Sequence, residues 1–291
     1  MDHGVEVLPS IRTKEKDEWK SRQIPSRMPS RIAQIRLVSG HPEVYEPCDD
    51  SFALVDALLA DQKNLLEHQP MFCMEVGCGS GYVITSLAIM LRQKDSAASV
   101  SYFATDINPH AVRVTSETLK AHTVHAEVLC DNIASSGLEK RLWGKVDVMV
   151  VNPPYVPTPE DEVGGDGIAS AWAGGENGRT VIDKILPVAD KLLSNKGWLY
   201  MVTLAANNPS QICLVMKGKG YASRIIVQRS TEEESLHVIK FWRDPDLQVG
   251  EPKDRSVATT TQRTSSVGLM DCIFLQFPSM PFWRNDNSST S

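Results

Sequence analysis

The chain has 291 residues, of which 42% are hydrophobic and 23% are charged. That length allows one sizeable α/β core but not two large domains. The formal net charge is −6, so the chain lacks the basic balance that drives tight, sequence-independent binding to a nucleic-acid backbone. We therefore expect one globular domain that does not bind nucleic acid stably.

The cysteines and the first residues bear on the compartment of the protein. Six cysteines are scattered along the chain, with no C-x-x-C pair and no histidine nearby at the spacing of a zinc site. Reduced thiols are expected, and no metal site. The first twenty residues mix acids with bases, unlike a secretory signal or a transit peptide. No run approaches the roughly 18 apolar residues of a membrane span. These features favour a cytoplasmic location, with the nucleus as an alternative, and no membrane association.

The two ends of the chain differ in composition from its middle. Residues 1–34 repeat Pro-Ser-Arg and have no apolar period that could build a core. From Pro245 onward Gly, Pro, Ser and Thr dominate. We predict a flexible leader over residues 1–34, a folded domain over residues 35–244 and a disordered tail over residues 245–291.

In the middle, short β-branched runs alternate with longer amphipathic stretches, which is typical of β-α-β units. A helix is expected first, over Ser51–His68. Strands are then expected at Phe72–Val76, Val100–Thr105, His125–Leu129, Val146–Val151, Trp198–Thr203, Ile225–Arg229 and Leu236–Phe241. Further helices are expected at Val83–Arg92, His110–Ala121, Arg179–Leu193 and Ser210–Lys217.

The spacing of these elements predicts the topology. Strands that alternate with helices form a mostly parallel sheet with helices on both faces. The last two strands are too close together for a long crossover helix, so one of them is predicted to run antiparallel at the sheet edge. The predicted fold is a doubly wound, seven-stranded α/β sheet with an accessory helix before it.

A glycine loop follows the first predicted strand. Gly77, Gly79 and Gly81 have the spacing G-x-G-x-G, whereas dinucleotide-binding loops have G-x-G-x-x-G. Side chains at such positions would keep the backbone from closing onto a ligand. Glu75 stands just before the loop, where it would oppose a pyrophosphate but would suit the ammonium group of an amino acid. The pattern therefore favours a sulfonium amino-acid nucleoside, S-adenosylmethionine, over a dinucleotide.

Two further carboxylates follow the next two predicted strands. Asp106 ends the second strand, where it could accept hydrogen bonds from both ribose hydroxyls. Asp131 follows the third strand, within reach of an exocyclic adenine amine. Each carboxylate alone is more often a helix cap than a ligand. Three of them at the ends of three successive strands favour the ligand interpretation.

The fourth strand runs into Asn152-Pro153-Pro154-Tyr155. Two prolines stiffen the turn and leave its carbonyls free. The side-chain amide of Asn152 and a proline carbonyl could then accept hydrogen bonds from an NH2 group, while Tyr155 packs against its π face. An amide or adenine nitrogen has little basicity, so orientation towards the methyl donor would be the main catalytic effect. This motif suits either acceptor.

These motifs together resemble the class I methyltransferases of the HemK type, specifically the eukaryotic and archaeal branch that modifies the glutamine of the Gly-Gly-Gln motif in class 1 peptide chain release factors. The resemblance covers about residues 36–244. The residues that carry it are Tyr45-Glu46-Pro47-x-x-Asp50-Ser51-Phe52, Glu75 to Gly81, Thr105-Asp106-Ile107-Asn108-Pro109, Asn152 to Pro159, Ala171 to Arg179 and Val238-Ile239-Lys240-Phe241.

The resemblance implies roles for individual residues. The acceptor amide would be held by the catalytic motif Asn152, Pro153, Pro154 and Tyr155. The S-adenosylmethionine site would comprise Tyr45, Pro47, Ser51, Glu75, Gly77, Gly79, Gly81, Asp106, Ile107, Asp131, Asn132 and Asn152. Ser51 stands where the family commonly has threonine, and it keeps the hydroxyl. Asn132 stands where an apolar residue is expected, so its backbone would have to serve.

The resemblance also implies partners. The substrate would be a peptide chain release factor, and a small zinc-ribbon activator subunit would form a heterodimer with this chain. The His125–Leu129 strand is a candidate apolar sheet edge for that subunit. Methylation of adenine N6 or of histone lysine remains an alternative activity. A non-catalytic, cofactor-binding scaffold is the alternative from outside the enzymes.

Overall fold

The computed structural model describes residues 30–92, 100–132, 137–165, 167–230 and 235–247. Residues 1–29 and 248–291 lie outside the described part, so for them the predicted leader and tail remain predictions. The last residues of the predicted leader contact the domain: Ala33 is 3% exposed in the core and its N–H donates to Ser86 Oγ, and Gln34 N–H donates to His122 Nε2. Residues 245–247 of the predicted tail form a short 3-10 helix. Among the described helices, none is both long and apolar enough to cross a bilayer.

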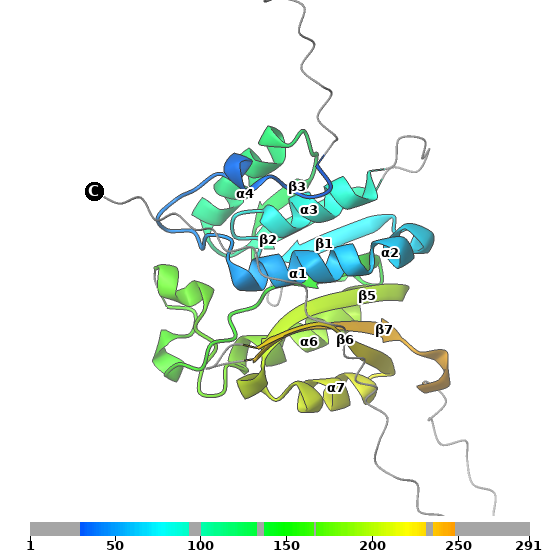
Figure 1. Cartoon of the computed structure of the whole chain (residues 1–291). Coiled ribbons are helices and arrows are strands. Elements are labelled where there is room, and N and C mark those ends of the chain that lie inside the picture. The colour runs from blue at the N-terminus through cyan, green and yellow to red at the C-terminus, as the bar shows by residue number, and fades with distance from the viewer. Residues whose placement is uncertain (1–29, 93–99, 133–136, 166, 231–234, 248–291) are drawn as a thin grey trace, which may run out of the picture.

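The described residues form a seven-stranded sheet in the order β3-β2-β1-β4-β5-β7-β6 (Figure 1). The strands are β1 (Phe72–Val76), β2 (Ser101–Asp106), β3 (Glu127–Cys130), β4 (Val146–Val151), β5 (Leu193–Leu204), β6 (Tyr221–Ser230) and β7 (Ser235–Arg243). Strand β1 pairs in parallel with both β2 and β4, at the point where the strand order reverses. A sheet of this kind binds ligands beyond the carboxyl ends of the strands at that point.

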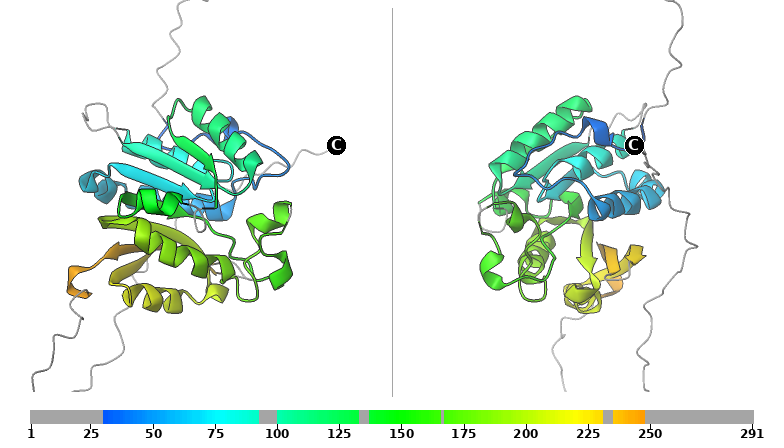
Figure 2. Two further views of the ribbon diagram at one scale, coloured as in Figure 1. Left: turned by 180° about the vertical axis from the view of Figure 1, so that it is seen from behind. Right: turned by 60° about the vertical axis from the view of Figure 1, so that its left-hand side comes forward.

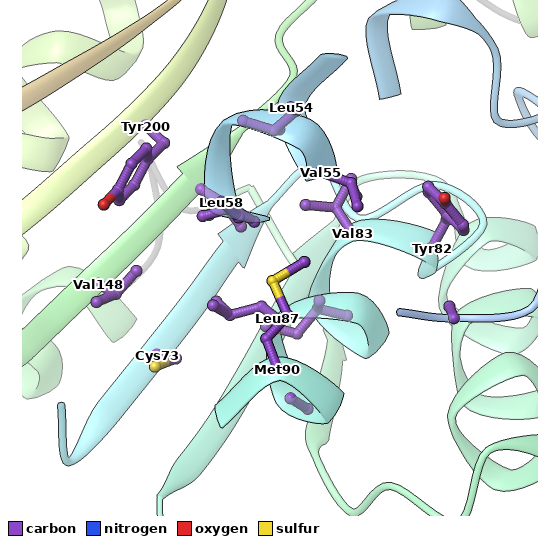
Figure 3. Packing of buried hydrophobic residues seen from close by; sticks show 14 of the residues in the cluster. Leu54, Val55, Leu58, Cys73, Tyr82, Val83, Leu87, Met90, Val148 and Tyr200 are labelled. Carbon is purple, nitrogen blue, oxygen red and sulfur yellow. The ribbon is translucent and has the colours of Figure 1, made fainter. Parts of the chain in front are cut away.

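Helices cover both faces of the sheet, as the view of Figure 1 and the view from behind in Figure 2 show. They are α1 (Asp49–Ala60), α2 (Gln62–His68), α3 (Tyr82–Leu91), α4 (Pro109–Ala121), α5 (Leu138–Leu142), α6 (Thr180–Leu192) and α7 (Pro209–Lys217). Helices α1 and α3 pack on one face, and α6 and α7 on the other. Figure 3 shows the first of these layers, in which Leu58 and Leu87 pack over Cys73 of the central strand.

The expected elements agree with most of the structure, and the exceptions have physical causes. The expected Ser51–His68 helix is broken into α1 and α2 at Asp61, whose φ is −100°. Its buried carboxylate accepts hydrogen bonds from Lys240 Nζ and Tyr200 Oη, both at 2.5 Å. Burial raises the pKa of Asp61, but these two bonds outweigh that effect and leave the pKa lowered. Backbone hydrogen bonds still cross this residue, from Asp61 N to the Ala57 carbonyl at 3.1 Å and from Leu65 N to the Asp61 carbonyl at 2.9 Å, so the break is a local change of backbone angles. Helix α5 was not expected.

The prediction that the antiparallel strand lies at the sheet edge is wrong. Strand β7 is antiparallel to both of its neighbours, but it lies between β5 and β6, and β6 forms the edge. Burial explains the order, because Val238, Ile239 and Phe241 of β7 are fully buried, whereas most residues of β6 are only partly so. The more apolar strand takes the inner position. Strand β3 forms the opposite edge, as expected.

Candidate active site

The glycine loop lies between the carboxyl ends of β1 and β2. The backbone N–H groups of Gly77 and Cys78 both donate to the carbonyl of Thr105, at 2.8 and 3.0 Å. Gly81 has φ +75°, and a Cβ there would lie 2.9 Å from the backbone of Thr115 in α4. Gly79 has φ +50°, and a Cβ there would meet nothing within 4 Å. Gly81 thus allows close packing of the loop on α4, while Gly79 leaves room for a ligand.

Glu75 is buried at the end of β1, with 2% of its surface exposed. Its Oε2 accepts a hydrogen bond of 2.9 Å from the backbone N–H of Ile84 in α3. Burial raises the pKa of Glu75 well above its ordinary value; the bond from Ile84 offsets part of the rise, and the carboxylate of Asp106 adds to it. A ligand that brings a positive charge would restore the ionised form, as an ammonium group would.

Asp106 stands at the end of β2, with both carboxylate oxygens held in place. Gly79 N donates to Oδ2 and Asn108 N donates to Oδ1, each at 2.9 Å. Burial raises the pKa of Asp106, and these backbone donors offset part of the rise. An ionised carboxylate offers about four lone-pair sites, so each oxygen can accept one more bond. The two fixed oxygens suit a ribose diol.

The residues predicted to reach adenine lie at the end of β3, next to this carboxylate. The backbone N–H of Asp131 donates to the carbonyl of Asp106 at 2.9 Å, which places the two strand ends side by side. Ile107 is 60% exposed and Asn132 is exposed as well. The structure thus gathers these predicted residues at one edge of the site, and their contact with adenine remains a prediction.

The Asn-Pro-Pro-Tyr motif follows β4, beside the glycine loop, and Asp50 at the start of α1 organises it. Asn152 Nδ2 donates to Asp50 Oδ2 at 3.0 Å, and Tyr155 Oη donates to the same oxygen at 2.8 Å. Burial raises the pKa of Asp50, but the bonds from Asn152, Tyr155, Cys48 and the backbone N–H of Ser51 together outweigh it, and the pKa lies below its ordinary value. An ionised Asp50 therefore holds both side chains.

Asn152 carries an unpaired acceptor. Its Oδ1 is buried and has no hydrogen-bond partner in the structure. A carboxylate accepts but does not donate, so Asp50 fixes the amide with Nδ2 towards itself and Oδ1 away from it. An unpaired buried oxygen costs about 1–3 kcal/mol. A substrate NH2 group would remove this cost, so the motif fits an acceptor of that kind.

The loop before α1 joins the acceptor side of the site. Tyr45 Oη and Ser51 Oγ both donate to Asp50, at 3.3 and 3.1 Å. Pro47 lies between them in the chain and is partly buried. The predicted cofactor residues of this loop are thus brought to the carboxylate that holds Asn152. Their contact with the cofactor remains a prediction.

Sequence reasoning missed two residues that shape the motif. Asp50 was given no role, although its place in the Tyr45–Phe52 motif was a signal. Asn207, fully buried after β5, donates from Nδ2 to the carbonyls of Tyr155 and Asn177, at 2.8 and 3.0 Å. It ties the acceptor turn to the segment before α6, and an isolated asparagine offers no comparable signal.

The last two residues of the acceptor turn complete the motif. Pro153 is buried and Pro154 partly so, and both prolines lie between the two side chains that Asp50 holds. The glycine loop, a buried carboxylate before it and a fixed carboxylate at the next strand end form a site for an amino-acid nucleoside. With an unpaired amide oxygen beside it, this is the site of a class I methyltransferase that uses S-adenosylmethionine.

Comparison with known proteins agrees with this class. The family described as Methyltransferase small domain matches residues 55–219. Human methyltransferase HEMK2 is 44% identical over 201 residues, which are 69% of this chain and 90% of that protein. The eRF1 methyltransferase catalytic subunit mtq2 of Schizosaccharomyces pombe is 34% identical over 221 residues, 72% of this chain and 94% of that protein. The chain therefore belongs to the HemK-type methyltransferases, in their eukaryotic and archaeal branch.

A solved structure has a similar fold. It is the E. cuniculi Mtq2-Trm112 complex, described as responsible for methylation of the eRF1 translation termination factor. The matched chain is 24% identical, the TM-score is 0.49, and the match covers 69% of this chain and 99% of that one.

Proposed function

We propose that this chain transfers the methyl group of S-adenosylmethionine to the side-chain amide nitrogen, N5, of the glutamine in the Gly-Gly-Gln motif of a translation release factor. The observation that carries the proposal is the buried Oδ1 of Asn152, which has no partner and is held away from Asp50. The printed names of the S. pombe and Methanocaldococcus jannaschii relatives, an eRF1 methyltransferase and a protein N5-glutamine methyltransferase, support the choice of acceptor.

The chemistry requires orientation more than acid or base strength. The lone pair of an amide nitrogen is delocalised, so the nitrogen must turn out of the amide plane as it is methylated. Asn152 Oδ1 would accept one N–H of the substrate amide, and a carbonyl of the Pro153-Pro154 turn the other. S-adenosylmethionine, when bound, would supply an electrophilic methyl group on sulfur. The motif would hold the amide nitrogen in line with that group, and the nitrogen would lose a proton to water as the methyl group leaves the sulfur. Hydrogen bonds that strengthen as the nitrogen becomes more acidic stabilise the transition state selectively.

The roles of the cofactor residues follow from their positions. Glu75 and Gly77 would bind the methionine moiety, with Gly79 leaving space for it. Asp106 would bind the ribose through its two fixed oxygens. Asp131 and the backbone near it would bind adenine.

The acceptor chain has room beyond the motif. A cavity of about 490 Å³ is lined by residues that come after Tyr155 in the chain, namely Pro157, Thr158, Pro159, Glu160 and Glu176. It is wide open to solvent, as the binding of a protein substrate requires. The backbone on one side of the acceptor glutamine would lie there.

A small zinc-ribbon activator subunit would bind the exposed edge of β3. Among the described residues β3 pairs only with β2, so its other edge can accept a strand from a partner. Leu129 is 40% exposed there, and Ile107, whose carbonyl accepts from Cys130, is 60% exposed. The S. pombe relative is named as a catalytic subunit, which supports an assembly. We expect this heterodimer in the cytoplasm, with the nucleus as the alternative.

The decisive experiment measures transfer of labelled methyl groups to a purified release factor, with and without the activator subunit. We expect label that requires both Asn152, tested as Asn152→Ala, and the acceptor glutamine, tested as a Gln→Ala release factor. Label that persists without that glutamine would move the acceptor to lysine or to another residue. Transfer to nucleic acid alone would favour adenine, and tight cofactor binding without any turnover would favour a scaffold.

A further inference from the structure

Three potential metal ligands gather outside the candidate active site, on the loop before α1 and on the first turn of α4. His110 Nε2 lies 2.8 Å from Glu43 Oε2, and the His41 ring stacks on the His110 ring with a centroid distance of 4.7 Å. One ligand atom from each of the three residues lies within 4.8 Å of the others. His41 and His110 are 69 positions apart in the sequence but meet in the fold.

The backbone beneath this cluster is fixed before any ion binds. His110 belongs to α4, and its N–H donates to Asn108 Oδ1 at 2.9 Å. On the loop, Asn108 Nδ2 donates to the Glu43 carbonyl at 2.7 Å. Val44, also on the loop, is 5% exposed and packs against Ala111 of α4. Both sides of the cluster are thus attached to α4, which keeps the entropy cost of assembling a metal site small.

The ligand set selects the class of metal. Two imidazoles and one carboxylate, with water in the fourth position, form a tetrahedral zinc site, whereas Mg²⁺ and Ca²⁺ prefer oxygen ligands alone. Zinc bonds of about 2.0–2.2 Å require ligand atoms roughly 3.4 Å apart. The side chains of Glu43 and His110 are 56% and 43% exposed, so rotation about their side-chain bonds can close the distance. His41 is 23% exposed, and its Nδ1 accepts a hydrogen bond of 3.2 Å from the backbone N–H of Glu43, which a metal bound through Nδ1 would displace. Imidazole lone pairs lie in the ring plane, so the stacked rings must turn before both can face one ion.

We propose that His41, Glu43 and His110 bind one zinc ion, which pins the loop before α1 to the start of α4. The site lies next to the candidate cofactor site, because Asn108 links Glu43 to Asp106: its Nδ2 bonds the Glu43 carbonyl and its N–H bonds Asp106 Oδ1. The ion therefore holds the loop that continues into Tyr45. It would be separate from any zinc carried by an activator subunit.

The test is calorimetric titration of Zn²⁺ into the untagged full chain, after removal of metal with a chelator and without the activator subunit. One ion is expected to bind with micromolar or tighter affinity, and Mg²⁺ is expected not to bind. Glu43→Gln and His110→Ala should each weaken zinc binding by more than about tenfold, since even changes to residues that only orient a ligand cost that much. His125→Ala, an exposed histidine elsewhere, is the matched control and should leave the affinity unchanged.

Two further measurements, of Tm and of X-ray absorption, distinguish loss of zinc ligands from a folding defect in the variants. Saturating Zn²⁺ should raise the Tm of the wild type and not that of Glu43→Gln, whose Tm without metal is expected to match the wild type. X-ray absorption of the zinc complex should show nitrogen and oxygen ligands at about 2.0–2.2 Å. Absence of zinc binding, or binding of equal strength in both loop and helix variants, would overturn the proposal.

Discussion

Replacing Asp50 with asparagine tests whether one carboxylate orients the acceptor motif. In the wild type, Asn152 and Tyr155 both donate to Asp50 Oδ2, at 3.0 and 2.8 Å. Hydrogen bonds to a charged group contribute about 1.5–3 kcal/mol and neutral ones about 0.5–1.5 kcal/mol, so each bond weakens by roughly 1 kcal/mol in Asp50→Asn. The pair loses about 2 kcal/mol of orientation, which corresponds to a fall in kcat of about 30-fold.

The assay is steady-state methyl transfer to the release factor, with cofactor affinity measured separately by calorimetry. We expect kcat to fall by more than the Kd of the cofactor rises, because Asp50 holds both Asn152 and Tyr155 of the acceptor motif, while it contacts the predicted cofactor loop only through Tyr45 and Ser51. The matched control is Asp49→Asn, which removes a neighbouring exposed carboxylate at the same helix start and should keep full activity. Equal losses in both variants, or an Asp50→Asn enzyme within about threefold of the wild-type kcat, would refute the reasoning.

Three further predictions concern other parts of the site. Gly178→Ala should lower the free energy of unfolding, measured by urea denaturation, by about 2–4 kcal/mol. The φ of Gly178 is +62°, and a Cβ there would overlap the Tyr155 carbonyl. Gly137→Ala is the control, because a Cβ at that position meets nothing within 4 Å. Because the pKa of Glu75 is raised, cofactor binding should release a proton, and the affinity for the cofactor should rise with pH up to that pKa. Calorimetry in buffers of different ionisation enthalpy tests this, and a binding enthalpy that is the same in every buffer would contradict it. Leu129→Asp should weaken activator binding by about 2 kcal/mol, and unchanged co-purification would exclude the β3 edge.

Elements with local signals could be predicted from the sequence. The four helices expected after β1 agree with α3, α4, α6 and α7 to within one residue at each end. Their ends could be predicted because amphipathic spacing and flanking glycine or proline residues are local features of the sequence. The glycine loop and the residues at the ends of β1, β2 and β4 could be predicted for the same reason. A parallel sheet then brings those ends together whatever the detailed packing.

Features that depend on distant partners could not be predicted. The partners of the Asp61 carboxylate, Tyr200 and Lys240, lie 139 and 179 residues away, and the sequence around Asp61 does not indicate them. The inner position of β7 depends on its burial relative to β6. The role of Asp50 could not be predicted, since its partners Asn152 and Tyr155 lie more than a hundred residues further along the chain.

The contact between Asp61 and Lys240 also bears on the order in which the chain can fold during synthesis. Asp61 ends the first helix, and Lys240 lies in the last strand, with its Nζ 3.1 Å from the centre of the Trp198 ring. A ribosome delivers the helix long before the strand, so until β7 is made the Asp61 carboxylate has Tyr200 and Asn64 as donors but lacks the positive charge of Lys240. We expect α1 to stay open to hydrogen exchange in nascent chains that stop before β7. Full protection of α1 in a chain ending at residue 234 would contradict this.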